Sequence, residues 1–234
     1  FPTRRSSDLR TDEALLAATA KADRLLNEIE EMVAMNCTAV DIAYSPNDLY
    51  RLKREGKKAI MLGIENGYAI GKDLSRVAHF RKRGVVYMTL CHNGNNDICG
   101  SARYNEENLG VTPFGEQVIQ EMNRLGMMVD LSHSGERTFY ETLDISSQPV
   151  VCSHSSSRAL CDHPRNLTDD QLRAIARKGG VVQVCLYSGF LRKERPAHIL
   201  DAIEHLNHMV NVMGIEHVGI GSDFDGDGGI IGCN

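Results

Sequence analysis

The chain has 234 residues, of which 42% are hydrophobic and 24% charged, and its formal net charge at pH 7 is −5. This is an ordinary globular composition, long enough for one large α/β domain or two small ones. The acidic balance without a basic block argues against nucleic acid or an anionic membrane surface as a partner, and no apolar run approaches the roughly 20 residues that a transmembrane helix needs.

The first nine residues, FPTRRSSDL, hold two arginines and no apolar core, so they are not a secretory signal peptide. They look like the translation of a sequencing-adapter oligonucleotide, and we expect residues 1–9 to be non-native sequence. We expect residues 10–234 to form one domain, because no linker rich in proline, glycine or serine interrupts them. The chain stops just after its last expected strand, so this domain is expected to be partial.

Three amphipathic helices carry clear start and stop signals. The first is expected over 11–35, where apolar residues recur at spacings of three and four after a Thr-Asp-Glu start. The second is expected over 112–126, with a proline just inside its start and a glycine just past its end. The third, over 168–180, begins at a capping threonine and stops at a glycine.

Short β-branched runs alternate with the helical stretches, and several are apolar nearly throughout, as in parallel strands covered on both faces. Seven strands are expected, over 37–44, 58–65, 84–90, 126–132, 149–154, 179–187 and 217–223. This alternation indicates an α/β fold, either a TIM-type (β/α)₈ barrel short of one strand or a doubly wound sheet. No Gly-x-Gly-x-x-Gly follows a strand, which weakens a nucleotide-binding version.

Five of these strands end in an ionisable side chain: Glu65, His92, His133, His154 and Asp223. The carboxyl ends of barrel strands converge on one mouth, where the active site lies. Five ionisable groups gathered there would repel and desolvate one another without a cation. Imidazole nitrogen and carboxylate oxygen are the usual zinc ligands of hydrolytic sites, so the pattern predicts a metal centre.

Each of these residues also has an ordinary structural interpretation. A single strand-end histidine is most often a hydrogen-bonded structural residue, and the glutamate of GIENG could cap the next helix. The acidic run SDFDGDGG could be a plain loop or a weak Ca²⁺ loop, although its spacing does not match an EF-hand. Five such residues on five strand ends favour the metal centre over these separate explanations.

The residues resemble the membrane (renal) dipeptidases, peptidase family M19, a branch of the amidohydrolase-like metal-dependent barrels. The resemblance runs from about residue 10 to the end, through GIENG, YMTLCHNGNND, GVTPFGEQVIQEMNRLGMMVDLSHSG, PVVCSHSSSRALCDHPRNLTDDQL and HVGIGSDFDG. The two Ser-His-Ser strand ends and the His-Pro-Arg-Asn segment are its most specific parts. It implies a TIM-type barrel, here incomplete, with the first strand and the C-terminal part missing.

The resemblance also implies a site with two zinc ions in the intact family member. Glu65 matches the bridging carboxylate, and His133 and His154 match the two imidazoles of one zinc. Two departures stand out: Asn66 replaces a glycine of the family's Gly-Ile-Glu-Gly-Gly, and the His-x-Asp motif that completes the other zinc is absent. We therefore expect one metal half-site to survive and the activity of this chain to be impaired.

The catalytic roles are implied by the same resemblance. Asp223 matches the acid/base residue, His92 a histidine that contacts the substrate and its tetrahedral intermediate, and Arg165 an arginine that holds the bound dipeptide. The implied function is that of a metallodipeptidase of the membrane dipeptidase type, which hydrolyses the peptide bond of a dipeptide with a zinc-activated water. A homodimer is the assembly to test.

Two alternatives stay open: a related barrel metal hydrolase of another small amide or lactone, and a catalytically inert fragment that only binds metal. Seven cysteines without a Cys-x-x-Cys pair are expected to be free thiols in a reducing compartment. This favours the cytoplasm for this chain, although an export signal could precede it in the gene.

Overall fold

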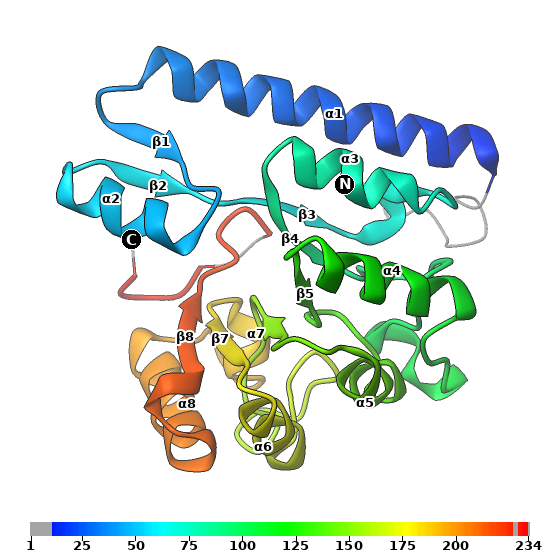
Figure 1. Ribbon diagram of the computed structural model, residues 1–234. Coiled ribbons are helices and arrows are strands. Elements are labelled where there is room, and N and C mark those ends of the chain that lie inside the picture. The colour runs from blue at the N-terminus through cyan, green and yellow to red at the C-terminus, as the bar shows by residue number, and fades with distance from the viewer. Residues whose placement is uncertain (1–10, 227–228, 234) are drawn as a thin grey trace.

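The computed structural model describes residues 11–226 and 229–233, so the nine residues expected to be non-native lie outside the described part. Parallel strands occupy the centre, and helices cover them on the outside (Figure 1). One sheet pairs β1 (Val40–Ile42) with β2 (Lys58–Ile60). A six-stranded sheet contains β3 (Leu62–Glu65), β4 (Val85–Thr89), β5 (Met128–Asp130), β6 (Val151–Cys152), β7 (Val181–Cys185) and β8 (Val218–Gly221).

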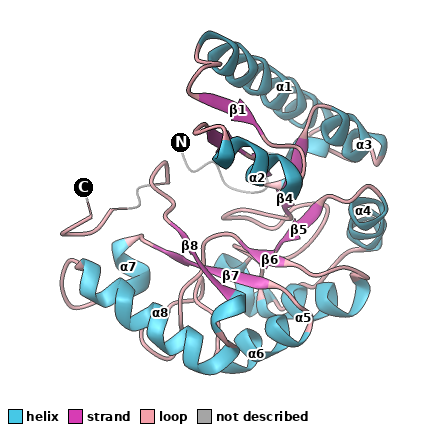
Figure 2. Cartoon of the chain, turned by 60° about the vertical axis from the view of Figure 1, so that its left-hand side comes forward, coloured by secondary structure: helices cyan, strands magenta, loops and turns pink. Residues whose placement is uncertain are grey.

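Every paired strand runs parallel to its neighbour, and each neighbour in the larger sheet is the next strand of the chain. A TIM-type barrel winds in this order, whereas a doubly wound sheet reverses its order at a switch point. Figure 2 shows β4 to β8 succeeding one another with the helices outside them. The expected α/β, TIM-type arrangement is therefore confirmed.

The strand expected over 58–65 is two strands, and this part of the prediction is wrong. Met61 separates β2 from β3, and the pairing with β4 shifts register between Leu62 and Gly63. At Gly63 the ring of Tyr87 fills the space that a Cβ would take. As a result of this break, β2 pairs with β1 in one sheet and β3 pairs with β4 in the other.

The three helices with clear sequence signals are all present: α1 (Asp12–Met35), α4 (Pro113–Arg124) and α6 (Asp169–Arg177). Each is capped by a threonine whose side chain accepts from a backbone N–H in the first turn, and α6 has a full capping box. The remaining helices are α2 (Pro46–Arg54), α3 (Ser75–Lys82), α5 (Glu136–Ile145), α7 (Ser188–Leu191) and α8 (Ile199–Met213), with short 3₁₀ turns η2 (Gly67–Ile70), η3 (Ala102–Glu107) and η4 (Ile215–His217).

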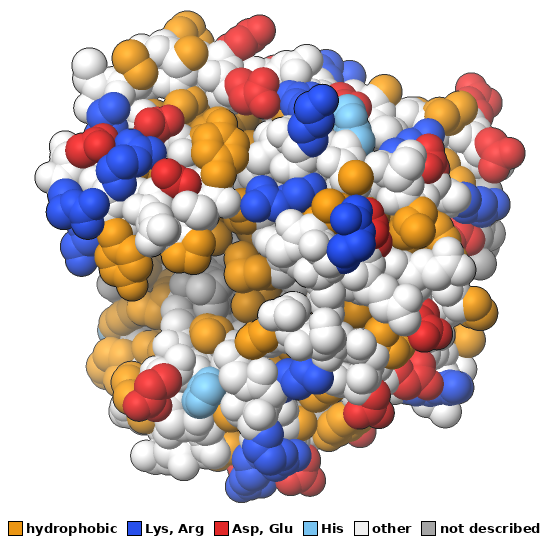
Figure 3. Space-filling view, viewed as in Figure 1, with side chains coloured by type: hydrophobic (Ala, Val, Ile, Leu, Met, Phe, Trp, Pro, Cys, Tyr) orange, Lys and Arg blue, Asp and Glu red, His pale blue; other side chains and the backbone are white. Residues whose placement is uncertain are grey.

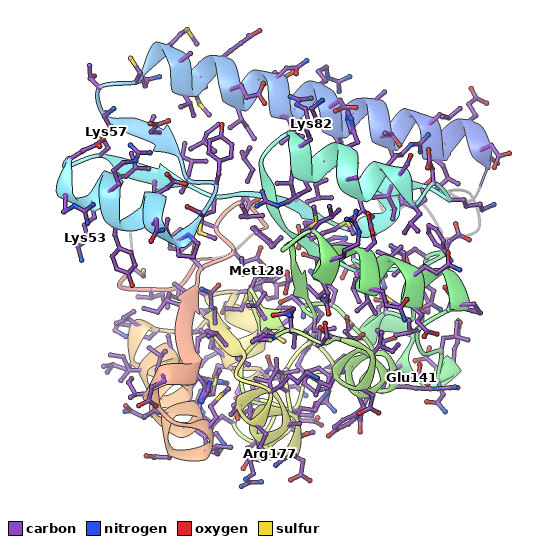
Figure 4. The ribbon with its side chains drawn as sticks, in the orientation of Figure 1. Lys53, Lys57, Lys82, Met128, Glu141 and Arg177 are labelled. Carbon is purple, nitrogen blue, oxygen red and sulfur yellow. The ribbon has the colours of Figure 1, made fainter. Side chains whose placement is uncertain are left out.

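The core lies between the strands and the outer helices. Helix side chains such as Phe80, Phe139 and Leu172 are 0% exposed there. Lys82, Glu141 and Arg177 project from the outer helices, whereas Met128 lies at the central strands (Figure 4). Acidic and basic side chains are intermingled on the face in Figure 3.

No helix in the described ranges is long and apolar enough to cross a membrane, and all seven cysteines are free thiols.

His205 ties α8 to the loop that follows β6. Its side chain is 1% exposed. Its Nδ1 accepts from the backbone N–H of Ser157 (3.0 Å), and its Nε2–H donates to the carbonyl oxygen of Leu191 (3.2 Å). Burial lowers the pKa of His205, Arg192 and His208 lower it further, and only the hydrogen bond to Leu191 and the charge of Asp201 act in the opposite direction. The ring is therefore held neutral.

We predict that His205 makes the fold sensitive to acid. The pKa of His205 in the folded protein lies below the unfolded value of about 6.5. The contribution of this residue to the free energy of unfolding is therefore complete above about pH 6.5 and is lost as the pH falls toward the folded pKa. His205→Gln keeps a donor and an acceptor but does not titrate. Between about pH 7 and pH 5 the Tm of the unmodified chain should fall further than that of the variant, by roughly 2–4 °C per kcal/mol of protonation cost. Equal losses of Tm would contradict this role.

Candidate metal centre

Three side chains with metal-ligating atoms meet where β3, β5 and β6 end. They are Glu65, His133 and His154, and their ligand atoms all lie within 4.8 Å of one another. Oε1 of Glu65 lies 3.1 Å from Nε2 of His133 and 3.2 Å from Nε2 of His154. The two Nε2 atoms are 3.0 Å apart. The structure therefore brings together the three residues that the sequence proposed as metal ligands.

The backbone is unusual at the strand ends that build this region. His133, Asn66 and Asp223 have positive φ values of 71°, 86° and 59°. Residues other than glycine seldom adopt a positive φ, and those that do are concentrated at functional sites. Asn66, with φ 86° and ψ 99°, lies outside the left-handed helical region as well. Its Oδ1 accepts from the backbone N–H of Tyr68 and from Nδ2 of Asn96, both at 3.1 Å.

The imidazole of His133 is oriented by a second contact on its other nitrogen. Its Nδ1 lies 3.1 Å from Oδ1 of Asn93. An amide oxygen only accepts, so Nδ1 carries the hydrogen and Nε2 directs a lone pair toward Glu65. A carboxylate and an imidazole lone pair 3.1 Å apart repel each other unless a cation or a proton lies between them. This donor set fits a divalent metal ion such as Zn²⁺.

The pKa shifts of these groups favour the protonation states that bind metal. Burial raises the pKa of Glu65, whereas hydrogen bonds from the imidazoles of His133 and His154, and their positive charge when protonated, lower it below its usual range. Burial is also the main reason that the pKa of His133 lies well below its usual value. Glu65 is therefore ionised and His133 neutral near pH 7, which are the forms required of metal ligands.

His92 and Arg165 lie against the three ligands. The His92 ring is tilted by 39° over that of His133, with centroids 4.3 Å apart, and burial lowers the pKa of His92. Arg165 is 7% exposed and its Nη2 donates to the carbonyl oxygen of His154 at 3.2 Å. Its guanidinium carbon is 5.3 Å from the ring centre of Phe190. Within the described residues its buried Nε has no hydrogen-bond partner, which leaves one donor available.

Asp223 follows β8 and is not one of the three clustered ligands. Its Oδ2 accepts a long hydrogen bond, at 3.6 Å, from the thiol of Cys185. Burial raises the pKa of Asp223, and the nearby Glu65 carboxylate raises it further, while His154 acts in the opposite direction. A carboxyl group with a raised pKa takes up and releases a proton more easily near neutral pH than an exposed aspartate does.

Sequence reasoning missed the residues that support the ligands from behind. They are Asn93, Asp130, Ser153 and Thr89, and they hydrogen-bond to the ligands or to one another. Asp130 had a visible signal, because it is the one charged residue in the strand GMMVDLS. Asn93 and Ser153 had no such signal in the sequence, since polar residues beside a strand-end histidine are common in loops.

A parallel β/α fold with a carboxylate and two imidazoles meeting at the carboxyl ends of its strands defines the class of metal-binding β/α-barrel proteins. Within this class, the family model for membrane dipeptidases, peptidase family M19, matches residues 6–232. The chain belongs to this family.

Curated relatives support the assignment. The uncharacterized dipeptidase C965.12 of Schizosaccharomyces pombe is 44% identical over 179 residues, which are 74% of this chain and 43% of that protein. Dipeptidase 3 of Mus musculus is 34% identical over 212 residues, which are 88% of this chain and 43% of that protein. The chain thus spans less than half the length of these relatives.

Solved structures share the fold. The probable dipeptidase PvdM from Pseudomonas aeruginosa superimposes with a TM-score of 0.84 at 29% identity, over 88% of this chain and 68% of that one. A metallo peptidase from Rhodobacter sphaeroides, liganded with a phosphinate mimic of the dipeptide L-Ala-D-Ala, gives a TM-score of 0.83 at 27% identity, over 95% of this chain and 65% of that one.

We predict that the purified 234-residue chain binds Zn²⁺ through the three clustered side chains. His154→Ala and Glu65→Gln should each weaken Zn²⁺ binding at least about tenfold, because each removes a ligand. The matched control is His208→Ala, whose imidazole bonds to Asp169 on the outer helices and should leave binding unchanged. Titration against a chromophoric chelator measures the affinity. A His154→Ala variant that binds Zn²⁺ as the unmodified chain does would rule out this ligand set.

Proposed function

We propose that this protein is a zinc-dependent dipeptidase of the membrane dipeptidase type, which hydrolyses the peptide bond of a dipeptide with a metal-activated water. The observation that carries the proposal is the convergence of Glu65, His133 and His154 in a chain of family M19. Because the chain spans 43% of the length of its first two curated relatives, the activity is proposed for the protein as a whole.

Glu65, His133 and His154 are the residues that would hold a zinc ion, and Glu65 would also serve as a ligand of a second one. A bound zinc ion lowers the pKa of a coordinated water to about 7 and polarises the scissile carbonyl. The second zinc needs ligands besides these three. The 3.0–3.2 Å separations of the ligand atoms and the neutral state of His133 support the first part of this proposal.

Three other side chains are proposed to handle the substrate. Asp223 accepts the proton of the attacking water and returns it to the leaving amine, a role that its raised pKa suits. His92 contacts the tetrahedral intermediate from its place beside His133. Arg165 binds the free carboxylate of the dipeptide, for which its guanidinium has a buried donor without a partner in the described ranges.

A dipeptide substrate is supported by the Rhodobacter sphaeroides metallo peptidase, which shares this fold and carries a phosphinate mimic of a dipeptide. A phosphinate reproduces the tetrahedral geometry that water attack creates at the peptide carbonyl, and such analogues bind more tightly than substrates do. The cytoplasmic compartment, which the free cysteines favour, and a homodimer, which the sequence leaves as an assembly to test, stay proposals.

We predict that, in the protein as a whole, Asp223→Asn leaves metal bound but lowers the turnover of a simple dipeptide by about 10²–10⁴-fold, because the amide cannot take the proton of water. Asp225→Asn is the matched control, since it changes an exposed carboxylate two residues away. Release of free amino acid gives the rate, and elemental analysis gives the zinc content. Near-normal turnover in Asp223→Asn would move the acid/base role to another group.

A substrate panel separates the proposal from its alternatives. We expect the zinc-loaded protein to release amino acids from dipeptides and to leave lactones and N-acylated amino acids intact. Hydrolysis of a lactone without hydrolysis of any dipeptide would identify a related barrel hydrolase. Zinc binding with no hydrolysis of any panel member would identify a metal-binding protein without catalysis.

A further inference from the structure

A buried carboxylate, Asp130, lies behind the metal ligands and has no role in the proposed chemistry. It is the last residue of β5 and is 0% exposed. Its Oδ1 accepts from the backbone N–H groups of Ser132 (3.0 Å) and Ser153 (2.9 Å). Its Oδ2 accepts from the hydroxyls of Thr89 and Ser153, both at 2.6 Å. Donors from three consecutive strand ends therefore satisfy this carboxylate.

The hydroxyl of Ser153 has a direction that Asp130 imposes. Its Oγ lies 2.6 Å from Oδ2 of Asp130, 2.8 Å from Nδ1 of His154 and 3.4 Å from the hydroxyl of Ser132. An ionised carboxylate only accepts, so the single hydroxyl hydrogen goes to Asp130 across the shortest contact. The lone pairs of Oγ then face Nδ1 of His154, which must donate.

This series of hydrogen bonds decides which nitrogen of His154 can bind a metal. With the hydrogen on Nδ1, the Nε2 lone pair points to Oε1 of Glu65 at 3.2 Å and to Nε2 of His133 at 3.0 Å. We propose that Asp130 is a positioning residue that acts through the Ser153 hydroxyl to hold His154 in the Nδ1–H tautomer and so present Nε2 to the metal. The inference rests on the proposed metal centre for the identity of the bound group.

The two metal-ligand imidazoles are oriented in different ways. His133 donates directly to the side chain of Asn93, which is exposed. His154 donates to a hydroxyl that is itself held by a buried charge. Metal-binding histidines generally donate their second N–H to a carboxylate or a carbonyl, and losing that partner costs about 10–100-fold in metal affinity. Here a serine hydroxyl lies between the carboxylate and the imidazole.

Asp130→Asn and Ser153→Ala interrupt the series at different points. In Asp130→Asn the amide can donate to Oγ of Ser153, which frees the hydroxyl hydrogen to point at Nδ1 of His154. In Ser153→Ala, Nδ1 loses its acceptor, whereas a hydrogen on Nε2 finds Glu65 at 3.2 Å. Both variants should therefore move the hydrogen to Nε2. Ser146→Ala is the matched control, because it removes another buried serine hydroxyl whose hydrogen bonds, among the described residues, are made to Asn123 and Gln148.

The test has two readouts on the 234-residue chain. Imidazole ¹⁵N chemical shifts of the metal-free protein at about pH 8 report which nitrogen of His154 carries the hydrogen, and competition with a chromophoric chelator gives the Zn²⁺ affinity. We expect Nδ1–H in the unmodified chain and in Ser146→Ala. In Asp130→Asn and Ser153→Ala we expect Nε2–H and Zn²⁺ binding weaker by about 10–100-fold.

If Nδ1 of His154 carried no hydrogen in the unmodified chain, the proposal would be overturned. Unchanged Nδ1 protonation in Ser153→Ala would overturn it as well, and so would a moved hydrogen with unchanged Zn²⁺ affinity. If Asp130→Asn does not fold, Ser153→Ala decides the outcome alone. Failure of the unmodified chain to bind Zn²⁺ would count against the metal centre itself, while the shifts of the metal-free protein would still decide whether Asp130 orients His154.

Discussion

The parallel pairing of consecutive strands is the constraint on which the rest of this structure depends. Because β3 to β8 run in the same direction and in chain order, their carboxyl ends lie on one side of the sheet. Glu65, His133 and His154 are 68 and 21 residues apart along the chain, yet their ligand atoms lie within 4.8 Å. No local interaction could bring these side chains together.

The convergence of these side chains costs electrostatic free energy, and the surrounding residues offset part of it. An ionised carboxylate and two imidazole nitrogens face one another, and His133 and His154 are only 6% and 8% exposed. Burial holds His133 neutral, and the Nδ1–H groups that face away from the site donate to Asn93 from His133 and to Ser153 from His154. The donor set of this cluster therefore fits a divalent metal ion.

The support behind the ligands is as specific as the ligands themselves. Thr89, Asp130 and Ser153 come from three neighbouring strand ends, and their hydrogen bonds of 2.6 Å join those ends below the site. Positive φ values at Asn66, His133 and Asp223 add local strain at the same edge. Packing of the outer helices, with Phe80 and Phe139 fully buried, must compensate for this strain, since each positive φ costs of order 1–3 kcal/mol.

Sequence by itself determined the features that depend on short-range order. Capping threonines and glycine stops located α1, α4 and α6, because helix ends are set by residues within one turn. Apolar runs located the strands, although one run, 58–65, covers both β2 and β3, and the spacing of the strand-end histidines together with neighbouring motifs identified the family. The strand-end acids Glu65 and Asp223 became candidates because three histidines stand at the ends of neighbouring strands.

Only the tertiary structure decided what depends on contacts between distant segments. The break at Met61 lies next to a register shift against β4, where Tyr87 packs over Gly63, and no pattern within residues 58–65 reveals that neighbour. The partners of the imidazole nitrogens, Asn93 and Ser153, were equally invisible, since a hydrogen-bond direction depends on the three-dimensional positions of both groups. Asp130 shows the difference most clearly: its charge in a buried strand could be noticed in the sequence, but the four donors that make it tolerable, and its link to His154, exist only once β4, β5 and β6 lie side by side.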